Sequence, residues 1–241
     1  MLLTVVMVIA RLSAQSPAFE AAAIKPSQEG PGHSSMHARI GMMTCSNESL
    51  RQLIRDAYRL NDNQIEGGPK WLDAERFDIN ARAAGAAEGP QIMAMLQTLL
   101  ADRFQLKFHK ETRLLPGFAL VVGKGGMKIK PVEAGDVNSN SHAENHHVLL
   151  EMEHVPMEAF VKVLSRQLHA PVEDETHVGG VYSFKLEYTL EELSANAPRS
   201  DVVDDVTVFT ALQDKLGLKL EARKVPTEVF VIDSAEKPNV D

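Results

Sequence analysis

The chain has 241 residues, of which 44% are hydrophobic and 24% charged, and its formal net charge at pH 7 is -8. This composition is close to the globular average, which excludes bulk disorder and fibrous architectures. The acidic excess argues against nucleic acid as a partner, since nucleic acid requires a concentrated basic footprint. The single cysteine excludes an internal disulfide framework and a multi-thiolate metal site.

The N-terminus has the pattern of a secretory signal peptide. Residues 2–10 are apolar apart from Thr4, and this run is too short for a hydrocarbon core that takes about 20 residues. The small residues Ser13 and Ala14 provide a cleavage point. A buried N-terminal strand or helix is the alternative. We predict a signal peptide over residues 1–14 and, once it is cleaved, a periplasmic or secreted protein with no membrane span.

Residues 19–123 are predicted to form a first structured segment. Leu50, Leu53 and Ile54 have the spacing of one helical face, and Pro90 suits the first turn of a later helix. The expected elements are a strand at residues 38–43, a helix at 48–59, a strand at 76–83, a helix at 90–103, and a hairpin of residues 105–112 and 117–123.

Residues 124–147 are rich in Gly, Asn, Ser and His and are predicted to form a linker loop. Residues 148–238 are predicted to form a second structured segment, in which Asp205 or Thr207 can cap the last helix and Gly217 can end it. A polar loop is expected at residues 191–206. The other expected elements are a strand at residues 148–153, a helix at 157–168, a strand at 182–189, a helix at 207–216, and a hairpin of residues 218–224 and 228–233.

Sequence similarity relates the two segments. Residues 99–108 (LLADRFQLKF) recur as residues 211–220 (ALQDKLGLKL). The apolar helical stripe, a following glycine pair and a strand of period-2 alternation recur in the same order, and an internal repeat of this kind indicates a duplicated folding unit. We therefore predict an α+β fold of two tandem βαβαββ-type repeats, with helices packed on largely antiparallel sheets.

A cluster of histidines and carboxylates is the first candidate for chemistry. Imidazole and carboxylate are ligands that zinc accepts. The cluster lies within thirteen residues and consists of His142, Glu144, His146, His147, Glu151, Glu153 and His154. The H-E-x-x-H pattern of helical zinc proteases is absent. The alternative is a solvated polar linker whose histidines only titrate.

The tryptophan and its neighbours are the second candidate. Trp71 follows a Gly-Gly-Pro turn and precedes Arg76, so it can anchor a ligand or cover the first helix. We expect a ligand in a cleft between the repeats, near Trp71 and Tyr182. No serine elbow is present, and Cys45 is interpreted as a core thiol.

Eight short motifs are distributed along the chain: residues 19–27 (FEAAAIKPS), 50–54 (LRQLI), 67–72 (GGPKWL), 76–79 (RFDI), 99–104 (LLADRF), 180–184 (GVYSF), 216–220 (LGLKL) and 231–233 (VID). Together they resemble the "soil-associated protein" family of exported bacterial proteins, a domain of unknown function. The resemblance implies export and carries no established enzymatic activity. Related copies at the extracytoplasmic end of membrane-bound sensor peptidases imply a sensing role, and the repeat is similar to interaction domains of secretins and TonB-dependent receptors.

We therefore expect an exported, non-catalytic binding or protein-interaction module without a cofactor. Its partner would be an envelope protein or a peptide bound through exposed strand edges, which need no catalytic side chain. The alternative is a metal-assisted hydrolase that uses the residues from His142 to His154. A structural envelope protein is a third possibility.

Overall fold

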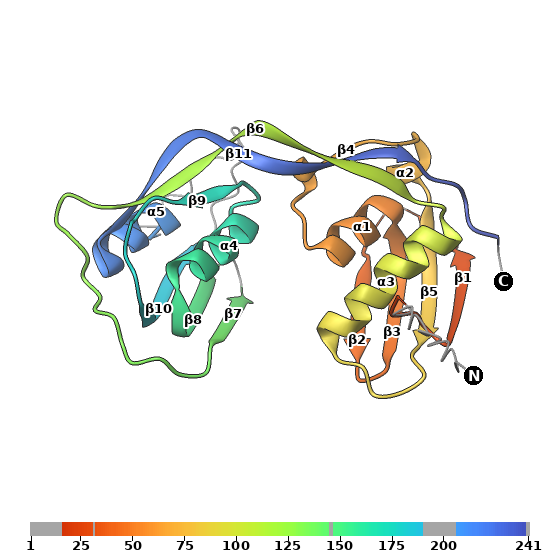
Figure 1. Ribbon diagram of the computed structural model, residues 1–241, viewed down its shortest axis with the longest axis horizontal. Helices are drawn as coiled ribbons and strands as arrows, with labels where there is room; N and C mark the ends of the chain where they lie inside the picture. Colours follow the sequence, from red (N-terminus) through yellow and green to blue (C-terminus); the bar gives the residue numbers. More distant parts are fainter. Residues whose placement is uncertain (1–15, 31, 145–146, 190–205, 240–241) are drawn as a thin grey trace, which may run out of the picture. The chain divides into compact units, whose positions relative to one another are not determined.

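Figure 1 shows the computed structural model of the chain, which describes residues 16–30, 32–144, 147–189 and 206–239. The signal peptide predicted for residues 1–14 lies outside these ranges, as does nearly all of the polar loop expected at residues 191–206. Within the described ranges, no helix combines the length and apolar character needed to cross a membrane.

The chain divides into two compact units, each assembled from separate stretches of sequence. The first contains the described residues up to Leu60, together with Ile65–Lys110 and the chain from Phe230 onward. The second contains Asn61–Gln64 and Glu111–Val229. Each unit has its own cluster of buried apolar side chains. The boundaries therefore differ from two contiguous segments, because the last strand of the chain ends in the first unit.

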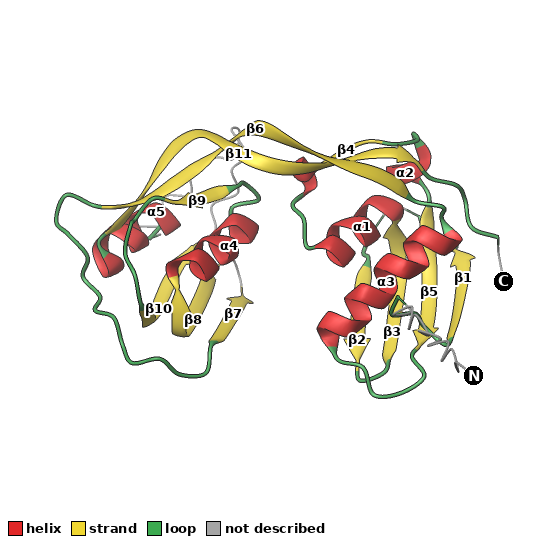
Figure 2. Cartoon of the chain, viewed as in Figure 1, coloured by secondary structure: helices red, strands yellow, loops and turns green. Residues whose placement is uncertain are grey.

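The first unit packs helices against an antiparallel sheet (Figure 2). Its elements are β1 (Ala21–Pro26), β2 (Ser35–Arg39), β3 (Met42–Ser49), α1 (Leu50–Tyr58), β4 (Ile65–Gly67), α2 (Trp71–Ala74), β5 (Arg76–Arg82) and α3 (Gly89–Arg103). The strand order of the sheet is β1-β5-β3-β2. Period-2 alternation on β5 buries Phe77 and Ile79 against the helices, as predicted. A capping box between Ser49 and Gln52 begins α1.

The second unit repeats this arrangement with fewer strands. Its elements are the 3-10 turn η1 (Asp62–Gln64), β7 (Asn138–Glu144), β8 (His147–Pro156), α4 (Met157–Gln167), β9 (Val172–Asp174), β10 (Val181–Thr189), α5 (Val208–Ala211) and the π-helical turn η2 (Leu212–Leu216). The strand order of its antiparallel sheet is β10-β8-β7. Thr207 caps α5 and Gly217, in the left-handed region at φ 72°, ends η2, which confirms both predictions.

The two predicted hairpins are wrong, because each is one continuous strand. β6 (Lys107–Val122) runs from the first unit into the second, and β11 (Leu218–Ser234) runs from the second into the first. Pro116 and Pro226 lie within these strands, since the proline φ of about -65° is compatible with an extended chain. β4 pairs in parallel with β11, and β9 in parallel with β6, so the strand order of this sheet is β4-β11-β6-β9.

Two shorter segments also differ from prediction. Residues 38–43 span the end of β2, a turn at Ile40 and Gly41, and the start of β3. Gly41 takes φ 70° in this turn, and its N–H donates to the Ala87 carbonyl at 2.9 Å. The loop expected at residues 124–147 contains β7, whose side chains are all exposed. A strand without a buried face carries no apolar alternation, so its sequence resembles a loop.

The α+β class is confirmed, and both sets of elements follow one order. The first is β2-β3-α1-β4-β5-α3-β6, and the second is β7-β8-α4-β9-β10-α5-β11. Each copy begins with a hairpin and ends with one long strand, which corrects the expected βαβαββ order. β1 precedes the first set, and no described strand occupies its place before β7.

Candidate binding site on the second unit

The sheet of the second unit has one buried and one exposed face. Along β8, Val148 and Leu150 are buried in the core, whereas His147 and Leu149 face away from it. Leu149 pairs with Glu187 on one neighbouring strand and with His142 on the other. The register therefore aligns side chains from all three strands on the exposed face.

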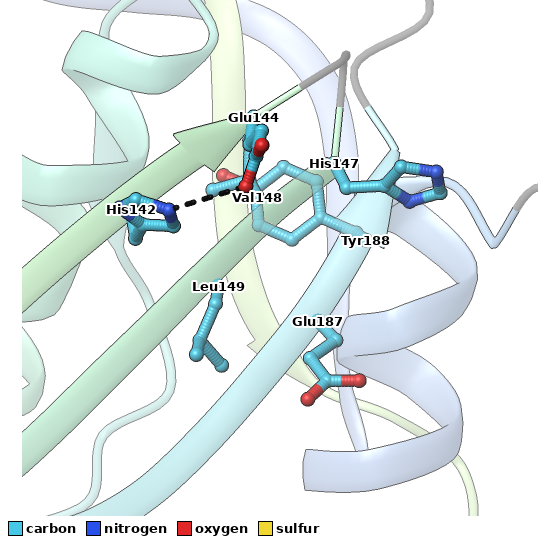
Figure 3. Close-up of a pocket in the computed structure, with 7 residues that line it drawn as sticks. All are labelled: His142, Glu144, His147, Val148, Leu149, Glu187 and Tyr188. Carbon is cyan, nitrogen blue, oxygen red and sulfur yellow. Dashed lines mark ion pairs between the residues drawn. The ribbon is translucent and has the colours of Figure 1, made fainter.

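A hollow of about 540 Å³ lies at this end of the sheet (Figure 3). His142 Nε2 is 3.8 Å from Glu144 Oε2, and both residues come from β7. His147 Nδ1 is 3.5 Å from the Thr189 hydroxyl. The residues that line the hollow are His142, Glu144, His147, Val148, Leu149, Glu187 and Tyr188.

Tyr188 differs from the other polar residues of the hollow because it is buried. Its side chain belongs to the core of the second unit, and its hydroxyl has no hydrogen-bond partner among the described residues. Burial raises the pKa of Tyr188 to about 12. The phenol therefore stays neutral at physiological pH and can donate one hydrogen bond without acting as a base.

The predicted metal ligands are only partly brought together. His142 and His147 line the hollow, but His154 lies elsewhere, with Nδ1 3.2 Å from the Asp136 carbonyl oxygen. His146 lies outside the described residues. No group of three or more His, Cys, Asp or Glu side chains in the described ranges is placed to hold a metal ion. Two carboxylates accompany these histidines: Glu144 lies beside His142, and Glu187 lines the hollow from β10.

The predicted ligand contacts have structural roles in their own units. Trp71 packs edge-on against Phe77, with ring centroids 6.4 Å apart. Arg76 donates to the Asn47 carbonyl at 3.2 Å and to Gln52 Oε1 at 2.6 Å, which joins a strand to the start of α1. Tyr182 is 3% exposed, and its hydroxyl donates to the Gly179 carbonyl at 3.0 Å. A ligand near Trp71 and Tyr182 stays a prediction.

Sequence reasoning identified Glu144 as a candidate ligand but missed Leu149 and Glu187 as members of the site. Alternation along each strand already places Leu149 and Glu187 on exposed faces. Their meeting with His142 depends on the cross-strand register, and nothing local in the sequence specifies that register when one strand is wholly exposed.

The first unit holds a different cluster of buried polar groups. Glu48 and Asn47 are 3% and 1% exposed, and one side-chain oxygen of each has no hydrogen-bond partner among the described residues. Burial raises the pKa of the Glu48 carboxyl, and Asp56 raises it further. Burial, with Glu48 and Asp56, raises the pKa of the Cys45 thiol to about 12. The thiol is thus protonated and inert, as expected of a core cysteine.

The fold and the hollow define an α+β protein of two units with one shared element order and a polar site on the second unit. The chain belongs to the family described as "Protein of unknown function (DUF3738)", whose model matches residues 51–235. No curated protein and no solved structure matches the chain.

Proposed function

We propose that the chain is an exported, non-catalytic binding module that takes a protein or peptide ligand at the hollow of the second unit. The observation that carries this proposal is the meeting of His142, Glu144, His147 and Glu187, from three strands, around a hollow of about 540 Å³. Convergent polar groups in a concave site are typical of ligand binding.

The charges of this face indicate the chemistry of the ligand. Glu144 and Glu187 line the hollow, and Glu151 and Glu153 follow on the same exposed face of β8. The basic residue of β10 is Lys185, and it forms an ion pair with Glu151. An acidic face of this kind favours a ligand that carries basic side chains or N–H donors.

The side chains that line the hollow favour a binding role over hydrolysis. Burial raises the pKa of Tyr188 to about 12, so this phenol is a poor source of a phenolate nucleophile or base. The hydrolase alternative requires metal ligands that converge on one point, and the described histidines and carboxylates are not arranged in that way.

A capture experiment tests the proposal. The purified chain is immobilised, and a detergent extract of bacterial envelope is passed over it. Glu187→Lys reverses the charge of the hollow and is expected to reduce the retained material at least about tenfold. Glu133→Lys, the same charge change at an exposed residue of the second unit that does not line the hollow, is the matched control and should retain as much as the unaltered chain. Equal retention by both variants, or none by the unaltered chain, would refute the proposal.

Export is tested separately. The full chain is expressed in a bacterial host, and the N-terminus of the protein in the periplasmic and medium fractions is determined by mass spectrometry. The proposal expects a mature chain that begins at Gln15. An intact chain confined to the cytosol would contradict export and leave the binding site to be judged by the capture experiment.

A further inference from the structure

In the sheet of the first unit, the outer edge of β5 is covered by β1. β1 lies antiparallel to β5, with Ala21 opposite Arg82 and Ile24 opposite Ile79. The Ser27 N–H extends the pairing by donating to the Arg76 carbonyl at 2.8 Å. Ile24 and Ile79 are both 0% exposed, so β1 closes the core as well as the backbone edge.

β10 is the counterpart of β5 in the second unit, residue by residue. Cys45 pairs with Ile79 just before a bulge in the first sheet. Met152 pairs with Phe184 just before a bulge of the same spacing in the second. Val181 therefore corresponds to Arg76, Phe184 to Ile79 and Glu187 to Arg82.

The outer edge of β10 is paired only at its two ends by the described residues. At one end the Val132 N–H donates to the Val181 carbonyl, and at the other the Thr189 N–H donates to the Val206 carbonyl, each at 2.9 Å. Because backbone groups alternate between neighbours along a strand, those of Ser183, Lys185 and Glu187 point to the same edge. No described backbone group bonds to them there.

Side-chain burial agrees with an uncovered edge. Phe184 is half-buried against the core of the second unit, whereas its counterpart Ile79 is fully buried beside Ile24 of β1. An unpaired strand edge beside partly covered apolar side chains is a template for another strand.

The segment that matches β1 in sequence meets β10 only at its end. Residues 24–26 (IKP) recur as residues 129–131 (IKP), directly before Val132. The Lys128 N–H donates to the Leu216 carbonyl and its Nζ to the Asp214 carbonyl, both at 2.9 Å. Ile129 packs against the core of the second unit, and Val132 pairs with Val181 as Ser27 does with Arg76. The described backbone of this segment therefore bonds to the edge of β10 at Val181 alone.

We infer that the edge of β10 between Val181 and Thr189 accepts an extended peptide from a partner protein, added as an antiparallel strand at the position of β1. The inference rests on the proposed function, since Glu187 and Tyr188 of β10 also line the hollow. Pairing as in β1 places apolar side chains of the peptide beside Tyr182, Phe184 and Leu186. Its N-terminal end lies at Glu187, where a basic side chain fits the acidic hollow.

The probe is a fluorescent peptide of residues 18–27 of the chain itself with Glu20→Lys (AFKAAAIKPS), because β1 fits the corresponding edge and Glu20, which pairs with Arg82, would otherwise lie beside Glu187. Its binding to the purified chain is measured by anisotropy. Lys185→Pro removes an N–H that points away from β8, and proline is tolerated where the N–H faces outward from an edge strand. We expect this variant to weaken binding at least about tenfold. Lys185→Ala loses the same ion pair with Glu151 but keeps the N–H, and it should bind like the unaltered chain.

A second measurement does not depend on the folding of the proline variant. In β1 the N–H groups of Ala23 and Lys25 point to the neighbouring strand, as that of Ser27 does. The same peptide with N-methyl groups at these two residues loses both N–H groups, and it should not bind the unaltered chain. Hydrogen exchange at the amides of Ser183, Lys185 and Glu187 should slow when the unmodified peptide is added.

The possible failures are distinct. Equal binding of the methylated and unmodified peptides, or no binding, overturns strand addition. Slow exchange at these amides without peptide would show that the chain's own residues cover the edge. A dimer that Lys185→Pro dissociates would show that a second copy of the chain occupies it. Either result also overturns strand addition by a partner peptide. If capture of envelope material is still lost in Glu187→Lys, the proposed function stands without strand addition.

Discussion

Asn47 and His154 occupy the same position in the two sheets. Each has a positive φ, 56° and 51°, at a bulge in the strand that follows a hairpin. The Asn47 N–H donates to Asp78 Oδ1 at 2.9 Å, and the His154 N–H donates to the Ser183 hydroxyl at 3.0 Å. Both units thus satisfy the N–H of the bulge with a side chain from the adjacent strand, as expected of a duplicated design.

Removing this acceptor should destabilise the first unit. Asp78→Ala leaves the Asn47 N–H without its partner, and we expect a loss of about 1–3 kcal/mol in the free energy of unfolding. Asn80→Ala removes an exposed side chain from the same face of β5 and serves as the control. Urea denaturation followed by circular dichroism measures both, and equal stability of the two variants would contradict a role for the Asp78 contact.

Two tyrosines of β10 should respond in opposite directions to loss of the hydroxyl. Tyr182→Phe removes a bond to the Gly179 carbonyl and should cost about 1 kcal/mol. Tyr188→Phe removes a buried hydroxyl without a described partner, so stability should be unchanged or higher by about 1–2 kcal/mol. Guanidinium denaturation compares the two. A clear loss in Tyr188→Phe would show that this hydroxyl is bonded in solution.

Glu48 should make the protein less stable as the pH rises. Burial and Asp56 raise its folded-state pKa above 4.5, so the folded chain holds a proton that the unfolded chain releases. Stability from this group is therefore present below pH 4.5 and is lost as the pH passes through the raised pKa.

The measurement compares Glu48→Gln with the unaltered chain by denaturation at a series of pH values. The variant should gain relative stability from pH 4.5 towards neutrality. Glu153→Gln, an exposed carboxyl substituted in the same way, controls for net charge. A difference between Glu48→Gln and the unaltered chain that does not change with pH would refute the expectation.

Cys45 should be unreactive in the folded protein. Its thiol is 1% exposed and its pKa is raised to about 12, so almost no thiolate is present at pH 8. Iodoacetamide labelling followed by mass spectrometry should modify the urea-unfolded chain and leave the native chain unmodified. Comparable rates in the two states would mean that the thiol is accessible.

Zinc should not be retained. The described residues present no group of three ligands, and two histidines alone hold zinc weakly. After dialysis against metal-free buffer, elemental analysis should give far less than one zinc per chain, and His142→Ala/His147→Ala should unfold at the same denaturant concentration as the unaltered chain. Stoichiometric zinc that this double variant loses would revive the hydrolase alternative.

The sequence alone identified part of the candidate site. His142, Glu144 and His147 stood out as potential ligands because of their residue type, and all three line the hollow. Glu187 was not identified, since only the pairing of Leu149 with its neighbours on both sides brings it beside them. The open edge of β10 was equally hidden, because an unpaired strand has the same sequence pattern as a paired one.

Local sequence signals determine the order of helices and strands in this chain. Apolar stripes specify α1 and α4, alternation specifies β5 and β10, and Thr207 marks the start of the last helix, since each signal acts within a few residues. Only the tertiary structure decides that β6 and β11 continue through Pro116 and Pro226 instead of folding back. Their partners β4 and β9 are distant in sequence, and pairing energy gained from distant strands leaves no trace in the local pattern.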